Sequence, residues 1–458
     1  MSDENKNVED ENKSEEKKKK PSALMFETLE DYLIRAEEIF NVMQDEATKK
    51  EITVINPLFL KILGNYLREA RIAMVEKTKP TVMYNFCIPP EIIYAMDCQP
   101  ICQEAGSVAL SITEREQIKY IDAAEEAGIS PEQCNAQKIW IGAIMKNEVP
   151  EPDCLLFGSQ PCDSTNILYQ VIEKFYNLPT YILDVPYWSY EEDNPFYDER
   201  VIPYFTEQVK GIFPWLEKVT GKKFDYDRLV QTIELSNKAR ELALELNELM
   251  KAKPSPCPSM MTFTEYLVLT TSSGTPQCIE YLQWMRDLAA RMVKEGKGAT
   301  EIMYNREEEI RLVWVYIPIF WDILLYDWME RRYGAVCVTD LMGYNYTQPV
   351  NTSSEDKIYE GLARNILDIP MGRQSRGMAE YYLDYLIMVV KEYKADGAIF
   401  GGHIACKHSW AIAQLLKEEL KKNTGVPMLT FEVDTMDPRV VKKSLIKKKL
   451  KTFLESLK

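Results

Sequence analysis

The sequence lacks a long hydrophobic run. Its most apolar stretch, Leu312 to Trp321, contains Pro318 and is followed by Asp322. That stretch is far shorter than the roughly 20 residues that a membrane-spanning helix needs. The first twenty residues mix Asp, Glu and Lys without an apolar stretch, which is typical of a disordered tail rather than a signal peptide. We therefore expect a cytoplasmic protein that has no membrane partner.

Positive charge is also scarce. The 55 Lys and Arg residues are outnumbered by 71 Asp and Glu residues, which gives a net charge of −16. Because this charge would repel nucleic-acid phosphates, it argues against a nucleic-acid partner. With 46% hydrophobic residues among 458, the chain can instead build well-packed interiors in two or three domains.

Compact cysteine pairs are missing as well. No CxxC…CxxC array occurs, and the pair Cys98 and Cys102 has no second pair beside it. In a cytoplasmic protein, ten cysteines are more often reduced, metal-bound or catalytic than joined in disulfides. A metal site would therefore combine cysteines from distant segments.

Strand-like segments alternate with helix-like segments in two parts of the chain. The strand-like segments are 81–87, 153–158, 180–186, 334–339, 396–400 and 426–434. Helical patterns follow several of them, for example over 378–394 and 409–422. This alternation favours parallel sheets covered by helices.

We predict an α/β fold with two Rossmann-like parallel-sheet lobes, a helical N-terminal lead-in and a helical linker region. The expected boundaries are a disordered charged tail over 1–25, the lead-in over 26–79, a first lobe over 80–190, a helical region over 191–300 and a second lobe over 301–458.

The only two histidines, His403 and His408, lie within a few residues of Cys406. Cys406 is predicted to lie in a turn between a strand and a helix, where open α/β sheets place their ligands. The positive end of the helix dipole favours a thiolate there, and hence metal ligation or nucleophilic chemistry. The alternative is that Cys406 packs as a small buried hydrophobic residue.

Two further cysteines are predicted in comparable positions. Cys162 follows a strand at the start of a helix, and Cys134 precedes an apolar helical stretch over 139–145. Three thiolates from two domains suit a metal cluster in the cleft between them. Scattered buried thiols remain an alternative, as does a zinc site built from Cys406 with His403 or His408.

Four segments, in the same order, resemble the 2-hydroxyacyl-CoA dehydratase family, which also contains the ATP-driven benzoyl-CoA reductases. The resemblance spans about residues 80 to 458. The segments are Ile88-Pro89-Pro90-Glu91-Ile92-Ile93, the stretch from Cys134 through Pro152-Asp153 to Cys162, the stretch from Thr220-Gly221-Lys222-Lys223-Phe224-Asp225 to Pro254-Ser255-Pro256, and the stretch from Asp396-Gly397-Ala398 through Cys406-Lys407 to Asp434-Thr435-Met436-Asp437-Pro438-Arg439.

The resemblance implies one [4Fe-4S] cluster per chain, bound by Cys134, Cys162 and Cys406 between the two lobes. It also implies a smaller homologous partner subunit and a separate iron–sulfur ATPase activator that injects one electron. The electron would reach the thioester carbonyl of an acyl-CoA and form a ketyl radical, from which water is eliminated.

Three catalytic candidates accompany the cysteines. Glu91 matches the family's Glu at the first strand–helix turn, where it can act as an acid/base, orient the substrate or simply cap the helix. His403 and His408 can donate a proton or a hydrogen bond to the substrate, or a hydrogen bond to a cluster sulfur. Lys407, Arg373 and Arg376 are candidates for holding CoA phosphates.

The sequence departs from the family between Tyr84 and Cys87. A Ser/Thr-rich loop suited to a substrate hydroxyl is replaced by Tyr84-Asn85-Phe86-Cys87, which leaves room for a flat or apolar acyl group. A benzoyl-CoA reductase-like activity is therefore an alternative, as is reduction at a double-cubane cluster fed by Cys87, Cys98 and Cys102. A third alternative is a non-catalytic partner subunit of the same fold.

Overall fold

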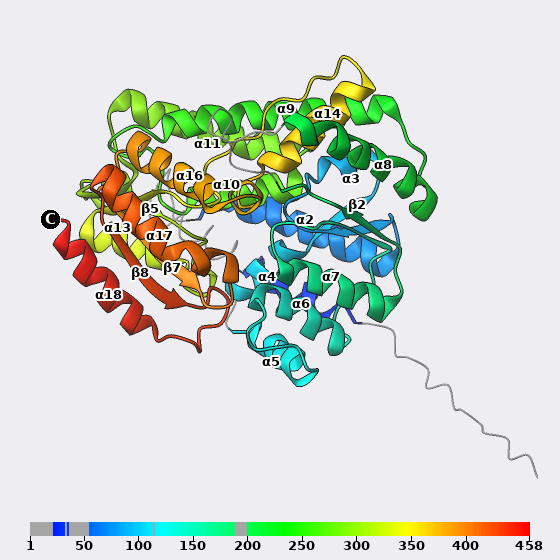
Figure 1. Ribbon diagram of the computed structural model, residues 1–458, viewed down its shortest axis with the longest axis horizontal. Coiled ribbons are helices and arrows are strands. Elements are labelled where there is room, and N and C mark those ends of the chain that lie inside the picture. The colour runs from blue at the N-terminus through cyan, green and yellow to red at the C-terminus, as the bar shows by residue number, and fades with distance from the viewer. Residues whose placement is uncertain (1–21, 33, 36–54, 113–114, 188–198) are drawn as a thin grey trace, which may run out of the picture.

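The computed structural model describes residues 22–458 except 33, 36–54, 113–114 and 188–198. Within these residues, two four-stranded parallel sheets form the centres of two lobes (Figure 1). The first sheet contains β1 (Thr81–Tyr84), β2 (Gln99–Cys102), β3 (Cys154–Gly158) and β4 (Thr180–Leu183). The second contains β5 (Ile310–Trp314), β6 (Ala335–Thr339), β7 (Gly397–His403) and β8 (Met428–Val433). The predicted fold of two Rossmann-like lobes is confirmed.

Both sheets have the same strand order. It is β2-β1-β3-β4 in the first lobe and β6-β5-β7-β8 in the second. In each sheet the chain moves to one side of its first strand and then crosses to the other side. The strand order therefore reverses between β1 and β3 and between β5 and β7, and open α/β sheets bind ligands at the carboxyl ends of such strands.

Two of the eight strands were not predicted. The segment that forms β2 contains Pro100, and proline normally argues against a strand. Proline is tolerated in β2 because β2 is an edge strand that pairs only with β1 in its sheet. β5 overlaps the start of the apolar run from Leu312 to Trp321. That run was interpreted only as a buried segment, without a strand.

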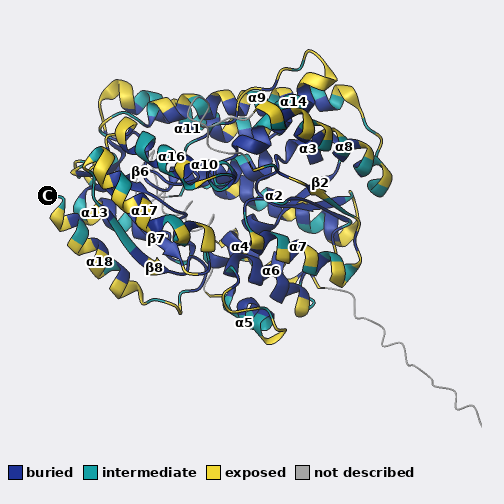
Figure 2. Cartoon of the chain, in the orientation of Figure 1, coloured by how far each residue is buried: buried dark blue, intermediate teal, exposed yellow. Residues whose placement is uncertain are grey.

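The helices of the first lobe pack around its sheet. They are α2 (Pro57–Glu76), α3 (Glu91–Ala95), α4 (Gln103–Ile112), α5 (Ile118–Glu126), α6 (Asn135–Met145) and α7 (Asp163–Tyr176). Residues 26–32 of the expected lead-in are helical, whereas its part from 36 to 54 lies outside the described residues. The expected tail lies outside them up to residue 21, but its residues 24 and 25 already belong to the helix, because the side chain of Met25 is buried. Figure 2 shows that α4 and α6 are buried along most of their length.

The helical region lies over both lobes. It contains the short η1 (Glu199–Val201), then α8 (Ile202–Thr220), α9 (Tyr226–Leu249), α10 (Met261–Ser272), α11 (Pro276–Glu295) and α12 (Ala299–Tyr304). The second lobe adds η2 (Phe320–Asp322), α13 (Leu324–Tyr333), α14 (Glu355–Asp368), α15 (Gly372–Ser375), α16 (Ala379–Glu392), α17 (Lys407–Thr424) and α18 (Lys443–Ser456). None of the helices in the described part of the chain combines the length and apolar character needed to cross a membrane.

One helix of the later sequence leaves its own sheet. α14 follows β6 but packs against α8, beside the first lobe (Figure 1). The rings of Tyr359 and Phe213 lie 5.2 Å apart, and Arg364 forms two hydrogen bonds to the carboxylate of Glu199 at 2.9 and 2.8 Å. The chain therefore crosses between the lobes more than once.

The close packing of α5 against α6 generates a first prediction. A Cβ at Gly142 would lie 1.8 Å from the backbone oxygen of Tyr120, whereas a Cβ at Gly64 in α2 would meet nothing within 4 Å. We expect Gly142→Ala to lower the free energy of unfolding by about 3 kcal/mol, because the backbone oxygen of Tyr120 cannot rotate away from the new methyl group as a side chain could. Gly64→Ala should raise it by about 1 kcal/mol through helix propensity. Urea unfolding of both variants tests this, and equal effects of the two substitutions would contradict the packing described.

Candidate functional site

All four loops that follow the central strands meet at one cavity. Phe86 follows β1, Cys162 follows β3, Tyr316 follows β5 and Cys406 follows β7, and each of them lines this cavity, termed here the main cavity. The carboxyl ends of the two sheets therefore face the same space, and the main cavity lies between the lobes. This is the place that the strand order predicts for a ligand.

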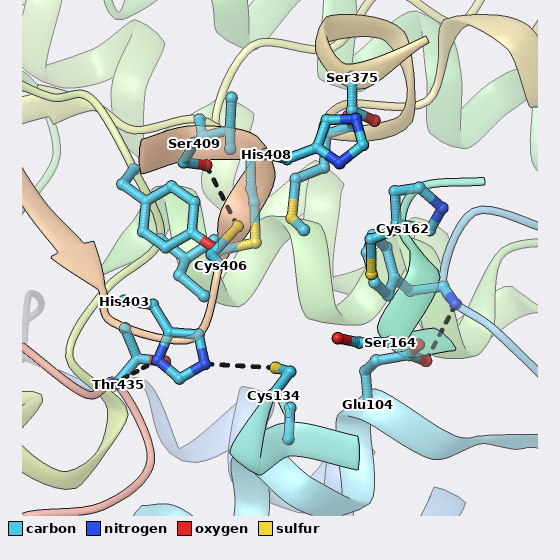
Figure 3. Close-up of a pocket in the computed structure, with 18 of the residues that line it drawn as sticks. Glu104, Cys134, Cys162, Ser164, Ser375, His403, Cys406, His408, Ser409 and Thr435 are labelled. Carbon is cyan, nitrogen blue, oxygen red and sulfur yellow. Dashed lines mark hydrogen bonds between the residues drawn. The ribbon is translucent and has the colours of Figure 1, made fainter. Parts of the chain in front are cut away.

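Three cysteines reach the main cavity from helix N-termini. Cys134, Cys162 and Cys406 each occupy the residue before a helix, namely α6, α7 and α17. All three line the main cavity (Figure 3). They are also the three cysteines that are only partly buried, since the other seven are buried. The three predicted ligand residues are thus brought together.

Each of the three sulfur atoms lies close to a polar side chain. Cys162 Sγ lies 3.5 Å from Thr165 Oγ1, and Cys406 Sγ lies 3.4 Å from Ser409 Oγ. Cys134 Sγ lies 3.3 Å from His403 Nε2. Burial raises the pKa of Cys162 to about 12 even though Thr165 opposes the shift. The thiol therefore keeps its proton at neutral pH unless a metal displaces it.

His403 is held between the lobes by a buried carboxylate. Its Nδ1 lies 3.1 Å from Asp434 Oδ2, and the same carboxylate oxygen accepts a hydrogen bond from Asn135 Nδ2 at 2.8 Å. Burial lowers the pKa of His403, but the charges of Asp434 and Cys134 outweigh it and hold this pKa well above its usual value. Protonated on both ring nitrogens, His403 donates to Asp434 through Nδ1 and to Cys134 Sγ through Nε2. In the neutral ring, Nδ1 instead accepts from the backbone N–H of Thr435 at 3.3 Å (Figure 3).

Asp434 is itself fixed by the backbone after β8. Its Oδ1 accepts from the backbone N–H groups of Met436 at 2.8 Å and Asp437 at 2.7 Å. Burial raises the pKa of Asp434, but His403 and these N–H groups lower this pKa by a larger amount, so the net shift is downward. The charged pair is thus the stable state of the two side chains.

The other two catalytic candidates lie apart from this pair. His408 is exposed in the first turn of α17 and lines the main cavity close to Ser375 (Figure 3). Glu91 does not line the main cavity. It is fully buried at the start of α3, forms an ion pair with Arg240 and lines a neighbouring cavity. Its predicted role as an acid/base or orienting group stays a prediction.

Glu104 is a site residue that the sequence did not reveal. It lies in the first turn of α4 and lines the main cavity (Figure 3). Its Oε2 accepts a hydrogen bond from the backbone of Phe86 at 3.1 Å, while its buried Oε1 has no hydrogen-bond partner among the described residues. Burial raises the pKa of Glu104 to about 7. Glu104 comes directly after β2. Recognising β2 as a strand would have pointed to Glu104, but Pro100 argued against a strand there.

Aromatic rings form much of the remaining wall. The rings of Phe86 and Tyr266 lie 6.2 Å apart, and those of Phe263 and Phe320 lie 5.2 Å apart. Tyr316 adds a buried ring beside Cys406. A flat or apolar group fits such walls better than a charged one.

The additional cysteines do not gather at one place. Cys102 lines the main cavity and Cys87 lines a separate small one. The Cys98 thiol donates to the backbone oxygen of Met96 at 3.4 Å.

The basic candidates have partners within the chain. Lys407 Nζ reaches across the lobes to Asp163 Oδ2 at 2.5 Å. Arg373 forms an ion pair with Asp368, and the buried Arg376 donates to the backbone oxygen of Leu367. Of the three, only Lys407 lines the main cavity, so it is the best placed of them to meet a phosphate there.

The chain is similar to a set of acyl-CoA enzymes. The family model described as 2-hydroxyglutaryl-CoA dehydratase, D-component, matches residues 85–457. A benzoyl-CoA reductase subunit of Thauera aromatica is 26% identical over 416 residues, which are 86% of this chain and 92% of that protein. The (R)-phenyllactyl-CoA dehydratase alpha subunit of Clostridium sporogenes is 24% identical over 356 residues, 77% of this chain and 83% of that protein. The resemblance stated from the sequence is confirmed.

The Asp434–His403 pair generates a second prediction. Asp434→Asn should lower the free energy of unfolding by about 3 to 5 kcal/mol, because it leaves a buried imidazolium without its counter-charge. Urea unfolding of metal-free protein measures the loss. In the double variant Asp434→Asn with His403→Gln, the loss should be smaller than the sum of the two single losses. Simple additivity would show that the two side chains do not stabilise each other.

Proposed function

Because the chain belongs to the 2-hydroxyglutaryl-CoA dehydratase D-component family, we propose that it is the cluster-bearing subunit of an ATP-activated radical acyl-CoA enzyme, a 2-hydroxyacyl-CoA dehydratase. One electron given to the thioester carbonyl forms a ketyl radical, hydroxide leaves the α-carbon and a proton leaves the β-carbon. The electron is then returned, so the net reaction is loss of water. The observation that best supports this proposal is the convergence of Cys134, Cys162 and Cys406 on one cavity.

The donor set fits a [4Fe-4S] cluster, one per chain. Iron–sulfur clusters are held by cysteine thiolates, and metal binding displaces the proton that a buried thiol otherwise keeps. In the described residues, no group of three or more His, Cys, Asp or Glu lies close enough together to hold a metal ion. Three thiols spread around one cavity suit ligands shared among several irons better than a single zinc ion. With three protein ligands, such a cluster supplies an electron and an iron with an open position for an oxygen atom.

Two protein groups are placed to move protons. Glu104 lies inside the main cavity, and one of its carboxyl oxygens has no partner among the described residues, so it can accept or donate a proton at the substrate. His408 lies at an exposed position of the same cavity, where it can exchange protons with water. His403 instead donates to Cys134, which fixes the position and charge of that sulfur.

Partner chains follow from the names of the relatives. The dehydratase relatives are alpha subunits, and the reductase relative is also named as a subunit. We propose that this chain also assembles with a smaller homologous subunit, and that an iron–sulfur ATPase supplies the electron in the cytoplasm under anaerobic conditions. The substrate is an acyl-CoA whose acyl group is apolar or aromatic, which the rings around the main cavity favour.

Reduction of an aromatic acyl-CoA is the second candidate function. Phe86 occupies the loop after β1 where a hydroxyl-binding residue would serve a 2-hydroxy substrate, and it lines the main cavity. The similarity to a benzoyl-CoA reductase subunit points the same way. Product analysis separates the two functions, since dehydration yields an enoyl-CoA without net electron consumption and reduction consumes electrons.

The cluster assignment generates a third prediction. Protein purified without oxygen should carry about four irons and about four acid-labile sulfides per chain. Cys406→Ala should lose them, whereas Cys278→Ala should keep them, because Cys278 is a buried thiol that does not line the main cavity. About eight irons would favour a double-cubane reductase. A wild-type protein free of iron would leave only the non-catalytic subunit of the same fold.

Glu104 generates a fourth prediction. Glu104→Gln keeps the size of the side chain but removes its proton transfer, so kcat should fall by about 100-fold or more. Iron content should stay at the wild-type level. The assay uses an acyl-CoA, ATP and an activating iron–sulfur ATPase, with the exposed Glu126→Gln in α5 as the control. Wild-type kcat in Glu104→Gln would remove Glu104 from the proposed chemistry.

A further inference from the structure

A second cavity, termed here the side chamber, adjoins the main cavity. Phe86, Tyr266, Thr270 and Met342 line both spaces, so the two cavities share part of their walls. The side chamber differs from the main cavity in its polar groups. These are Glu91, Arg240, Glu265, Ser273, Asn345 and Thr347.

Glu265 is the side-chamber residue whose whole carboxyl group has no partner among the described residues. It lies in α10 and is only 7% exposed. Among the described residues, no hydrogen bond or ion pair involves its carboxyl group. Burial, together with the carboxylate of Asp340, raises the pKa of Glu265 to about 8. A buried carboxyl group without a partner is costly, and such groups are normally satisfied by a ligand or by water.

Most of the other polar groups of the side chamber are paired with one another or with neighbouring residues. Arg240 is paired with Glu91 and also donates to Asn237 Oδ1 at 3.3 Å, so its charge is balanced. Ser273 Oγ donates to Ser236 Oγ at 3.2 Å. Asn345 Oδ1 accepts from the backbone and the hydroxyl of Thr347 at 3.1 and 2.8 Å. Two further atoms of this lining have no partner among the described residues, the acceptor Glu91 Oε2 and the donor Asn345 Nδ2. With the carboxyl group of Glu265, the unpartnered acceptor groups therefore outnumber the one unpartnered donor group.

We propose that the side chamber is a specificity subsite for a hydrogen-bond-donating group, a hydroxyl or an ammonium, which Glu265 accepts. The group is carried at the end of the acyl chain remote from the thioester. This placement rests on the proposed function, which puts the thioester in the main cavity. An aromatic ring between the two ends would pass Phe86 and Tyr266, and its donor would emerge beside Glu265.

Small probes test the subsite without CoA. Binding of p-cresol, 4-methylbenzylamine and toluene is measured by ligand-observed NMR titration on the anaerobically purified protein. Both donor compounds should bind about tenfold more tightly than toluene. Glu265→Leu should abolish this preference. Glu265→Gln should keep the preference for p-cresol, because an amide oxygen still accepts from a hydroxyl, and should lose the preference for the amine.

Glu104→Gln is the matched control, because it changes the buried carboxyl of the main cavity. It should leave the preference for donors unchanged. If the preference instead disappears in Glu104→Gln and persists in Glu265→Leu, the main cavity binds the donor and the inference is wrong. It is equally wrong if wild-type protein binds p-cresol no better than toluene, since water alone would then satisfy Glu265.

Two thioesters separate this inference from the proposed function. They are 3-phenylpropionyl-CoA and 3-(4-hydroxyphenyl)propionyl-CoA, which lack the 2-hydroxyl and do not react. If the hydroxylated thioester binds more tightly and this preference depends on Glu265, both the subsite and the acyl-CoA function are supported. If neither thioester binds while the preference for p-cresol persists, the acyl-CoA function fails and the subsite remains. If both thioesters bind equally well and p-cresol shows no preference, the subsite fails and the acyl-CoA function remains.

Discussion

The carboxylate of Asp434 is the interaction on which the site depends. It follows β8 in the second lobe, yet it binds Asn135 of the first lobe and His403 of its own lobe. Because His403 in turn contacts Cys134, one buried charge fixes the N-terminus of α6 in the first lobe relative to the end of β7 in the second. A buried charge tolerates little displacement, since any lost partner leaves it without compensation. The lobes therefore meet at the site in one defined arrangement.

The sequence predicted the parts of the fold that depend on local pattern. The turns that carry Cys162 and Cys406 were found because an apolar strand followed by a helix start is a local signal. β2 was missed because Pro100 opposes strand formation, and only its edge position, which is a tertiary property, makes that proline acceptable. β5 was missed because a short apolar run does not distinguish a strand from another buried segment.

The candidate site shows the same division. The sequence placed three cysteines at helix starts, but it could not state that Asp434 would orient His403, because the two residues come together only when β7 and β8 pair. Glu104 was missed together with β2. Glu91 resembled a site residue by its local motif, yet its side chain faces Arg240 in α9 rather than the cysteines. Proximity between elements that are distant in the chain is the information that local patterns lack.

The course of α14 has a consequence for the history of such a chain. This helix belongs to the sequence of the second lobe but packs its ring of Tyr359 on Phe213 of α8. If the chain were split near residue 300, α14 would belong to the second fragment and α8, on which it packs, to the first. The two lobes share one strand order, but the packing of α14 on α8 joins them into one unit. Recombination could exchange the pair as a whole more easily than either half.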